Sequence, residues 1–250
     1  MRVPVMRGVV ERRLLVNYRA DPDVVTKMLP APFVPQLHNG NAVVGICLIR
    51  LGALRPSGLP AALGTTSENA AHRIAVRWHD DGGEHCGVYI PLRHSGSALN
   101  VAVGDRLFPG LHERADFVVE ESGDEIAVAF RSRDGKCTVD AAVVVSDELI
   151  GSQLFASTAA ASDFFRAGSA GFSPRRRGRV LDGLELQTDA WTIEPTLIGH
   201  VASSMFDDAT VFPLGTIELD SALVMRGVPV EWHGVGSIPC GDGPRELSPN

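Results

Sequence analysis

Short runs of alternating apolar residues, separated by turn residues, most constrain what this chain can fold into. Three such runs follow one another between residues 117 and 145, and the middle run places Ile126, Val128 and Phe130 at every second position. The segments 122–124 (Ser-Gly-Asp) and 133–136 (Arg-Asp-Gly-Lys) lie between the runs and are typical of tight turns. A period of two is that of a strand with one buried face, so we predict an antiparallel meander of three strands.

Strand patterns recur on both sides of this meander. We expect strands at residues 9–18, 41–51, 66–79 and 86–90, and several more in the last third of the chain. Two helices interrupt them: Asp21 followed by Pro22 begins a short helix before Pro30, and Ser157 caps a second helix that Gly168 ends. No repeat or linker divides the chain, so residues 1–250 are predicted to form a single domain with a frayed end from about residue 240.

Composition excludes several classes of protein. With 44% apolar and 21% charged residues the chain is of ordinary globular composition, and its net charge of −7 provides no basic surface for nucleic acid. Arginine-interrupted apolar residues at the N-terminus exclude a signal-peptide core, and no apolar run is long enough to cross a membrane. The four cysteines include no C-x-x-C pair, which argues against a disulfide framework and a cysteine-rich zinc site and favours a cytoplasmic protein. The arginine-rich segment 175–179 is either a solvated loop or an anion-binding loop.

Residues 87–117 carry a resemblance to a known family. They include G-V-Y-I-P, followed by A-V-G-D-R-L-F-P-G-L-H-E-R-A-D-F. These pieces resemble the acetoacetate decarboxylase-like superfamily, whose members carry a Gly-Arg-Glu turn, a Gly-Phe-Pro bend and then two lysines. The W-x-x-E-P and D-S-A-L-x-M-R segments near the end resemble a less characterised branch of the same superfamily. The resemblance implies an α+β, mainly β fold: an antiparallel, cone-like β-barrel or sheet with a few short helices. We also expect the protein to form a homo-oligomer.

The lysine that would form a Schiff base in this superfamily is missing. The two positions after Pro109 are Gly110 and Leu111, and the whole chain contains only Lys27 and Lys136. Both lysines fall in patterns typical of exposed positions. Arginine cannot replace lysine in imine chemistry, because its guanidinium stays protonated. We therefore expect any catalysis to proceed without an imine.

Candidate site residues lie on the expected strands and in the breaks between them. If a strand begins near Thr66, then Glu68 and His72 share one face with Ala70 and Ile74, whereas Arg73 faces the other way. The resemblance makes Glu68 the best match to a superfamily glutamate on this strand. Arg50 interrupts an otherwise apolar row, so it either extends to solvent or pairs with a substrate carboxylate. Glu68 could equally be a surface carboxylate, and His72 a hydrogen-bonded core histidine.

The remaining candidates come from the segment after this strand. We predict that Glu68, His112 and His94 exchange protons, and that the substrate is bound by four other side chains. These are Arg50, Arg106, Tyr89 and His72. Eight histidines include several within residues 79–112, but their spacing matches no metal-ligand motif, so no metal site is predicted. Neither a phosphate-binding loop, nor a dinucleotide fingerprint, nor a G-x-S-x-G elbow occurs, and no cofactor is expected.

Two classes of function follow. The favoured hypothesis is a lyase-like enzyme whose pocket takes a small oxo acid or related carboxylate, with enolisation, dehydration, retro-aldol cleavage and hydrolysis as the reaction types open to it. The alternative is a non-catalytic barrel that binds a small apolar or amphipathic ligand, and a structural oligomer subunit is a third reading. An enzyme should bring Glu, His and Arg side chains together with perturbed pKa values, whereas a binding protein should line its pocket with Val, Ile and Phe.

Overall fold

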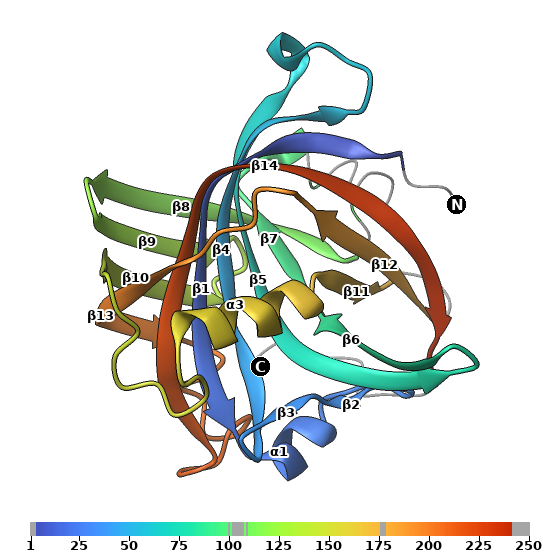
Figure 1. Ribbon diagram of the computed structural model, residues 1–250, viewed down its shortest axis with the longest axis vertical. Coiled ribbons are helices and arrows are strands. Elements are labelled where there is room, and N and C mark those ends of the chain that lie inside the picture. Colours follow the sequence, from blue (N-terminus) through green and yellow to red (C-terminus); the bar gives the residue numbers. More distant parts are fainter. Residues whose placement is uncertain (1–3, 100, 102–107, 109, 176–178, 242–250) are drawn as a thin grey trace.

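One large, strongly curved sheet forms most of the protein (Figure 1). A computed structural model describes residues 4–99, 101, 108, 110–175 and 179–241, and these residues form a 14-stranded sheet. The strands are β1 (Met6–Ala20), β2 (Val34–Pro35), β3 (Leu37–His38), β4 (Asn41–Pro56), β5 (Thr65–Asp80), β6 (Gly83–Tyr89), β7 (Arg93–Ser95), β8 (His112–Ser122), β9 (Glu125–Ser132), β10 (Thr138–Val145), β11 (Ala170–Pro174), β12 (Val180–Gln187), β13 (Glu194–Ser203) and β14 (Ile217–Pro239). The helices are α1 (Pro22–Thr26), the 3-10 helix η1 (Ala61–Leu63) and α3 (Thr158–Ala167).

Both predicted helices form where their capping residues indicate. The Asp21 side chain accepts a hydrogen bond from the backbone N–H of Asp23 (2.8 Å) at the start of α1. Ser157 accepts from the backbone N–H of Ala160 (3.1 Å) at the start of α3, and Gly168 follows its last residue. The sequence prediction is therefore confirmed for both helices. Pro30 was expected to stop the first helix, but α1 already ends at Thr26.

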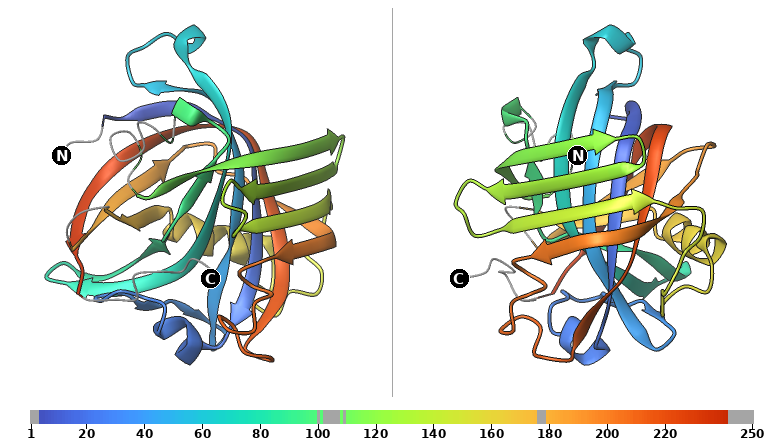
Figure 2. Two further views of the ribbon diagram at one scale, coloured as in Figure 1. Left: turned by 180° about the vertical axis from the view of Figure 1, so that it is seen from behind. Right: turned by 90° about the vertical axis from the view of Figure 1, so that its left-hand side faces the viewer.

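The order of the strands wraps the sheet into a ring. The main path runs β12-β11-β6-β5-β7-β8-β9-β10-β13-β14-β1-β4-β3, and further pairings join β12 to β14 and β4 to β5. These extra pairings close one circuit through β5, β4, β1, β14, β12, β11 and β6. The predicted meander is confirmed as β8, β9 and β10, which cross in front of the long strands in the right-hand view of Figure 2. The sheet is mixed rather than purely antiparallel, because β6 pairs with β11 and β7 with β8 in parallel.

The three neighbouring strands β1, β4 and β5 divide their side chains by parity over residues 12–20, 41–51 and 67–80, between the register shifts. The even-numbered residues, such as Leu14, Ile46 and Ile74, lie in the largest hydrophobic cluster, together with side chains of the β8–β10 meander. We call this side of the three strands the even face. The odd-numbered residues point to the other side, the odd face. The parity predicted for residues 66–79 is confirmed by this arrangement.

Two structures cover the odd face along its length. At one end, α3 packs Phe164 and Phe165 into a cluster with Leu15, Val43 and Ala75. Beyond that cluster, β6, β11 and β12 lie opposite the same face and leave space between the layers. None of the helices within the described ranges has the length and apolar character needed to cross a membrane.

Candidate functional site

A cavity of about 270 Å³ lies against the odd face of β1, β4 and β5. Its volume falls at the lower end of the range typical of small-molecule sites. Much of its wall is apolar, and these side chains come from strands far apart in the sequence. The larger apolar residues are Met6, Ile49, Leu51, Leu54, Leu63, Val88, Ile90, Leu99, Phe108, Leu184, Leu186 and Trp232.

Arginines supply most of the charge around the cavity. Arg13 comes from β1, Arg73 from β5 and Arg93 from β7, and Arg55 lies near the rim. Arg55 donates to the backbone oxygens of Leu59 (2.9 Å) and Ala53 (2.7 Å), so its hydrogen bonds are satisfied by the chain itself. The other three are the cations that the fold brings to the cavity.

Positively charged side chains dominate the charge of the described cavity lining. Neither Asp nor Glu occurs among the described residues that line it. Burial lowers the pKa of both Arg73 and Arg93 to about 10, which still leaves both guanidiniums charged at neutral pH. A ligand carrying negative charge would therefore be attracted to this space.

Polar groups of a different kind lie beside the arginines. His112, the first residue of β8, pairs in parallel register with Arg93 and lines the cavity. Its Nδ1 lies 2.9 Å from the backbone oxygen of Gly110, so Nδ1–H donates to that oxygen. Cys47 on β4 also lines the cavity as a free, partly buried thiol. The site thus combines fixed cations with one histidine suited to proton transfer.

Glu68 and Arg50, two residues predicted for the site, lie instead on the even face. Glu68 accepts from Arg12 Nη2 and from Arg50 Nε, both at 2.5 Å. Glu121 accepts from the same two arginines, at 2.6 Å from Arg12 and 2.9 Å from Arg50. The four side chains form a closed ionic network, which we call the Glu68 network, and neither Glu68 nor Arg50 lines the cavity.

Two ring-bearing candidates, His72 and Tyr89, belong to the core and do not line the cavity. His72 packs against Phe206 with ring centroids 5.4 Å apart, and its Nε2 lies 3.3 Å from Ser203 Oγ. Tyr89 packs against Phe33 in the largest hydrophobic cluster. His94 does line the cavity, and its buried ring also packs at a tilt against Phe130, with 5.0 Å between centroids.

Burial controls the protonation of these core histidines. It lowers the pKa of His72 to about 3, and the nearby His94 lowers it further. Burial also lowers the pKa of His94 to about 4, against a smaller opposing effect of Asp134. Both rings are therefore neutral at pH 7, as expected for core histidines.

Two further sequence predictions concern segments that lie wholly or partly outside the described residues. Arg106 lies outside the described residues, as do residues 176–178 of the arginine-rich segment. Of that segment, Arg175 pairs with Asp182, with Nη2 and Oδ1 2.7 Å apart. Among the described residues, no group of three His, Cys, Asp or Glu side chains is placed to hold a metal ion.

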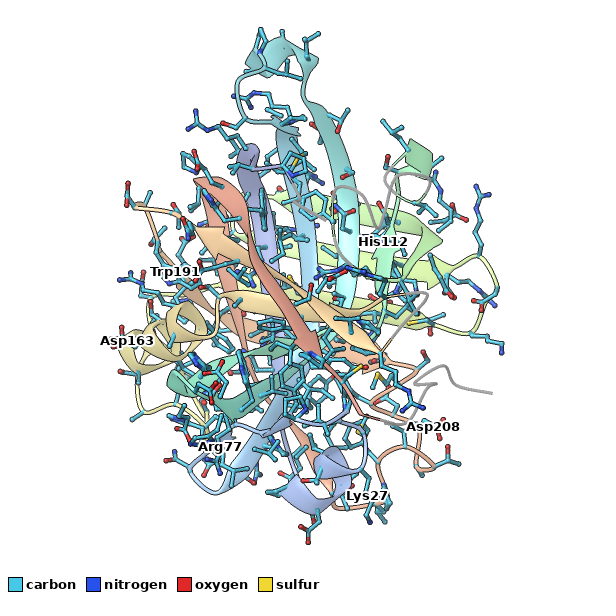
Figure 3. The ribbon with its side chains drawn as sticks, turned by 90° about the vertical axis from the view of Figure 1, so that its right-hand side faces the viewer. Lys27, Arg77, His112, Asp163, Trp191 and Asp208 are labelled. Atoms are coloured by element: carbon cyan, nitrogen blue, oxygen red, sulfur yellow. The ribbon has the colours of Figure 1, made fainter. Side chains whose placement is uncertain are left out.

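Neither lysine of the chain lies at the cavity. Lys27 and Lys136 are both exposed, and neither is among the lining residues. Figure 3 shows Lys27 near α1, well away from His112. An amine for imine formation is thus not provided by either lysine side chain.

Sequence reasoning did not select Arg13, Arg73 and Arg93 as site residues. Arg13 follows Glu11 and Arg12, and Arg73 follows His72, so neither arginine interrupts an apolar row as Arg50 does. Parity alone cannot tell which face of a strand will border a cavity, and the candidates on β4 and β5 were chosen from the even face.

Comparison with protein families identifies the chain. A model of the DUF2071 family, described as an uncharacterized conserved protein, matches residues 9–224. The chain belongs to the DUF2071 family. No curated protein matches it.

Solved structures show which fold this DUF2071 member has. Acetoacetate decarboxylase from Legionella pneumophila subsp. pneumophila str. Philadelphia 1 matches 95% of this chain and 88% of its own with a TM-score of 0.64 and 12% identity. An acetoacetate decarboxylase-like enzyme from Sphingomonas wittichii RW1 matches 97% and 94% with a TM-score of 0.57 and 14% identity. The enduracididine biosynthesis enzyme MppR complexed with pyruvate matches 96% and 91% with a TM-score of 0.57 and 14% identity. The predicted acetoacetate decarboxylase-like fold is therefore confirmed.

Proposed function

We propose that this protein binds a small oxo acid or related carboxylate in the cavity and promotes proton transfer on it without forming an imine. The carboxylate would pair with the cavity arginines, because a guanidinium and a carboxylate form strong charge-assisted hydrogen bonds. His112 would move the proton from the position beside Arg93. The observation that carries the proposal is a cavity whose lining includes Arg13, Arg73, Arg93 and His112 while both lysines are exposed.

The fold supports a small-molecule ligand of this class. One protein of similar fold has been solved with pyruvate, and another structure of it holds the condensation product of pyruvate and imidazole 4-carboxaldehyde. Both ligands of that protein derive from an oxo acid. Enolisation is the simplest reaction that such a ligand and a single basic histidine allow, because it needs only removal of a proton next to the carbonyl.

Solvent exchange tests the proton transfer directly. The protein is incubated with pyruvate in D2O, and loss of the methyl proton signal is followed by NMR. We expect exchange above the buffer rate for the wild type and a decrease on the order of 100-fold in His112→Gln. The exposed His79→Gln variant is the matched control and should exchange like the wild type. Equal exchange in His112→Gln and wild type would refute the role of His112.

Borohydride reduction separates imine from non-imine chemistry. Treatment with borohydride in the presence of pyruvate or acetoacetate should leave the mass of the protein unchanged. A stable adduct on Lys27 or Lys136 would contradict the proposal, and peptide mapping would identify the lysine.

The apolar wall of the cavity favours a second candidate, a non-catalytic binding protein. Leu184, Leu186 and Trp232 form a surface suited to an apolar or amphipathic ligand. If pyruvate stabilises the protein against heat but its protons do not exchange, this candidate replaces the enzyme. Self-association into a homo-oligomer and a cytoplasmic location stay predictions, which light scattering on the purified protein and cell fractionation would test.

A further inference from the structure

Two arginines of the cavity, the buried Arg73 and the partly buried Arg13, have buried hydrogen-bond donors that the described residues do not use. Arg73 is only 3% exposed, and its Nη2 donates to Asn17 Oδ1. Its Nε and Nη1 are buried with no hydrogen-bond partner among the described residues, and the same holds for Nε and Nη1 of Arg13. A buried charged donor without an acceptor is costly, so a partner that supplies acceptors is expected to bind there.

The two guanidiniums influence one another across the cavity. Burial is the main cause that lowers the pKa of Arg73, and repulsion from Arg13 acts in the same direction. Both side chains line the same space, which has no Asp or Glu among its described residues. One negative charge would therefore neutralise only part of the charge that these two arginines place there.

We propose that the cavity binds a dianion, namely a short dicarboxylate whose two carboxylates pair with Arg13 and Arg73. This inference rests on the proposed function, in which the ligand is a carboxylate, and adds a second acidic group to it.

The placement of the two arginines favours a dicarboxylate over a compact dianion such as phosphate. Arg13 is on β1 and Arg73 is on β5, and β4 lies between these strands. The Arg73 side chain reaches over β4, because its Nη2 donates to Asn17 Oδ1 on β1. Asn17 is roughly 13 Å from Arg13 along β1, at about 3.3 Å per residue. Cys47 of β4 is opposite Leu15, between these two positions, and lines the same cavity. Two acceptors joined by a short carbon chain match this arrangement of two donors and an intervening apolar surface.

Calorimetry with matched pairs of acids tests the proposal. Malonate, succinate, glutarate and adipate are each compared with the monocarboxylate of the same chain length, and with inorganic phosphate, at one ionic strength. The best dicarboxylate should bind at least about 10-fold more tightly than its monocarboxylate, as expected for a second charge-assisted pair. Arg13→Gln and Arg73→Gln should each lower dicarboxylate affinity roughly 10- to 100-fold. Monocarboxylate affinity should change by less than about threefold in either variant, because the remaining arginine still binds it.

Arg77→Gln is the matched control. Arg77 is on the same strand and parity as Arg73 but pairs with Glu84 outside the cavity (2.9 Å), so its variant should bind both acids like the wild type. If Arg73→Gln does not fold, Arg13→Gln decides the test. Alkylation of Cys47, which lines the cavity, provides a second measurement. A bound dicarboxylate should slow the reaction of this thiol with iodoacetamide, and mass spectrometry measures the alkylated fraction.

The possible results separate this inference from the proposed function. Equal binding of mono- and dicarboxylates would overturn the inference and leave the proposed function standing. Tighter binding of phosphate than of every dicarboxylate would also overturn it. If no carboxylate of either kind binds, the proposed function itself fails.

Discussion

Arg12 and Arg13 are neighbours in β1, yet the fold treats their charges in opposite ways. The side chain of Arg12 is 2% exposed on the even face and pairs with Glu68 and Glu121. Arg13 points to the odd face, where the described cavity residues include no carboxylate. The register confirms the alternation, because Arg12 is opposite Arg50 and Arg13 is opposite Ile49 on β4.

The difference shows how to tell a structural arginine from a binding arginine. In the Glu68 network, each of two arginines contacts both carboxylates, so the charges are balanced within the chain. At the cavity, buried donors of Arg13 and Arg73 lack partners among the described residues. We therefore expect substitutions in the first region to change stability and those in the second to change ligand binding.

The largest effect is expected from Glu68→Gln. It leaves Arg12 buried with only Glu121 as a carboxylate partner, so the free energy of unfolding should fall by about 3 kcal/mol. Urea denaturation measures it, and Glu218→Gln, which breaks the more exposed pair with Arg19, should change stability by less than about 0.5 kcal/mol. If Glu68→Gln instead keeps its stability and abolishes proton exchange on pyruvate, Glu68 is catalytic, as the sequence predicted.

Acid should destabilise the even face through its buried histidines. The pKa of His72 is about 3 in the folded protein, below the ordinary value of 6.5 that applies after unfolding. Between these values the unfolded chain binds the proton and the folded chain does not, so stability falls as the pH drops below 6.5. The expected loss is about 2 kcal/mol between pH 7 and 5 for one such histidine.

His72→Gln removes this pH dependence and provides the measurement. Between pH 7 and 5, the unfolding free energy of His72→Gln should fall by about 2 kcal/mol less than that of the wild type. His79→Gln, at a more exposed position on the same strand, should follow the wild type. Parallel pH curves for His72→Gln and wild type would show that folding does not lower the pKa of His72.

Arg13→Met should have a smaller effect on stability and of opposite sign to that of Glu68→Gln. Replacing a partly buried cation, whose buried donors lack partners among the described residues, by an apolar side chain of similar length should leave the unfolding free energy unchanged or raise it by about 1 kcal/mol. Urea denaturation without added ligand measures it. A loss of more than about 2 kcal/mol would mean that Arg13 has a structural role like that of Arg12.

The smallest effect concerns the reactivity of Cys47. Anionic iodoacetate should be attracted to the cavity arginines, whereas neutral iodoacetamide should not. The ratio of the two alkylation rates should be roughly threefold or more higher at Cys47 than at Cys86, whose surroundings include Glu84. Mass spectrometry of peptides measures both sites in one sample, and equal ratios would indicate that the cavity is not electropositive.

Much of the fold was predictable because its causes are local. Alternation in residues 117–145 predicted the meander, and Asp21 and Ser157 predicted where the two helices begin. The missing lysine was also visible, since only Lys27 and Lys136 occur in the chain and both are exposed. Parity correctly separated Glu68 and His72 from Arg73.

The sequence by itself determined which residues share a face of a strand, because side-chain direction depends only on a period of two. It could not determine what covers each face. Glu121, which balances Arg12, is 109 residues away in the chain, and Leu184 and Trp232 of the cavity wall come from strands still more distant from β1. Only the closing of the sheet through β6, β11, β12 and β14 decided that the odd face borders a cavity, because pairing between distant strands depends on the whole chain.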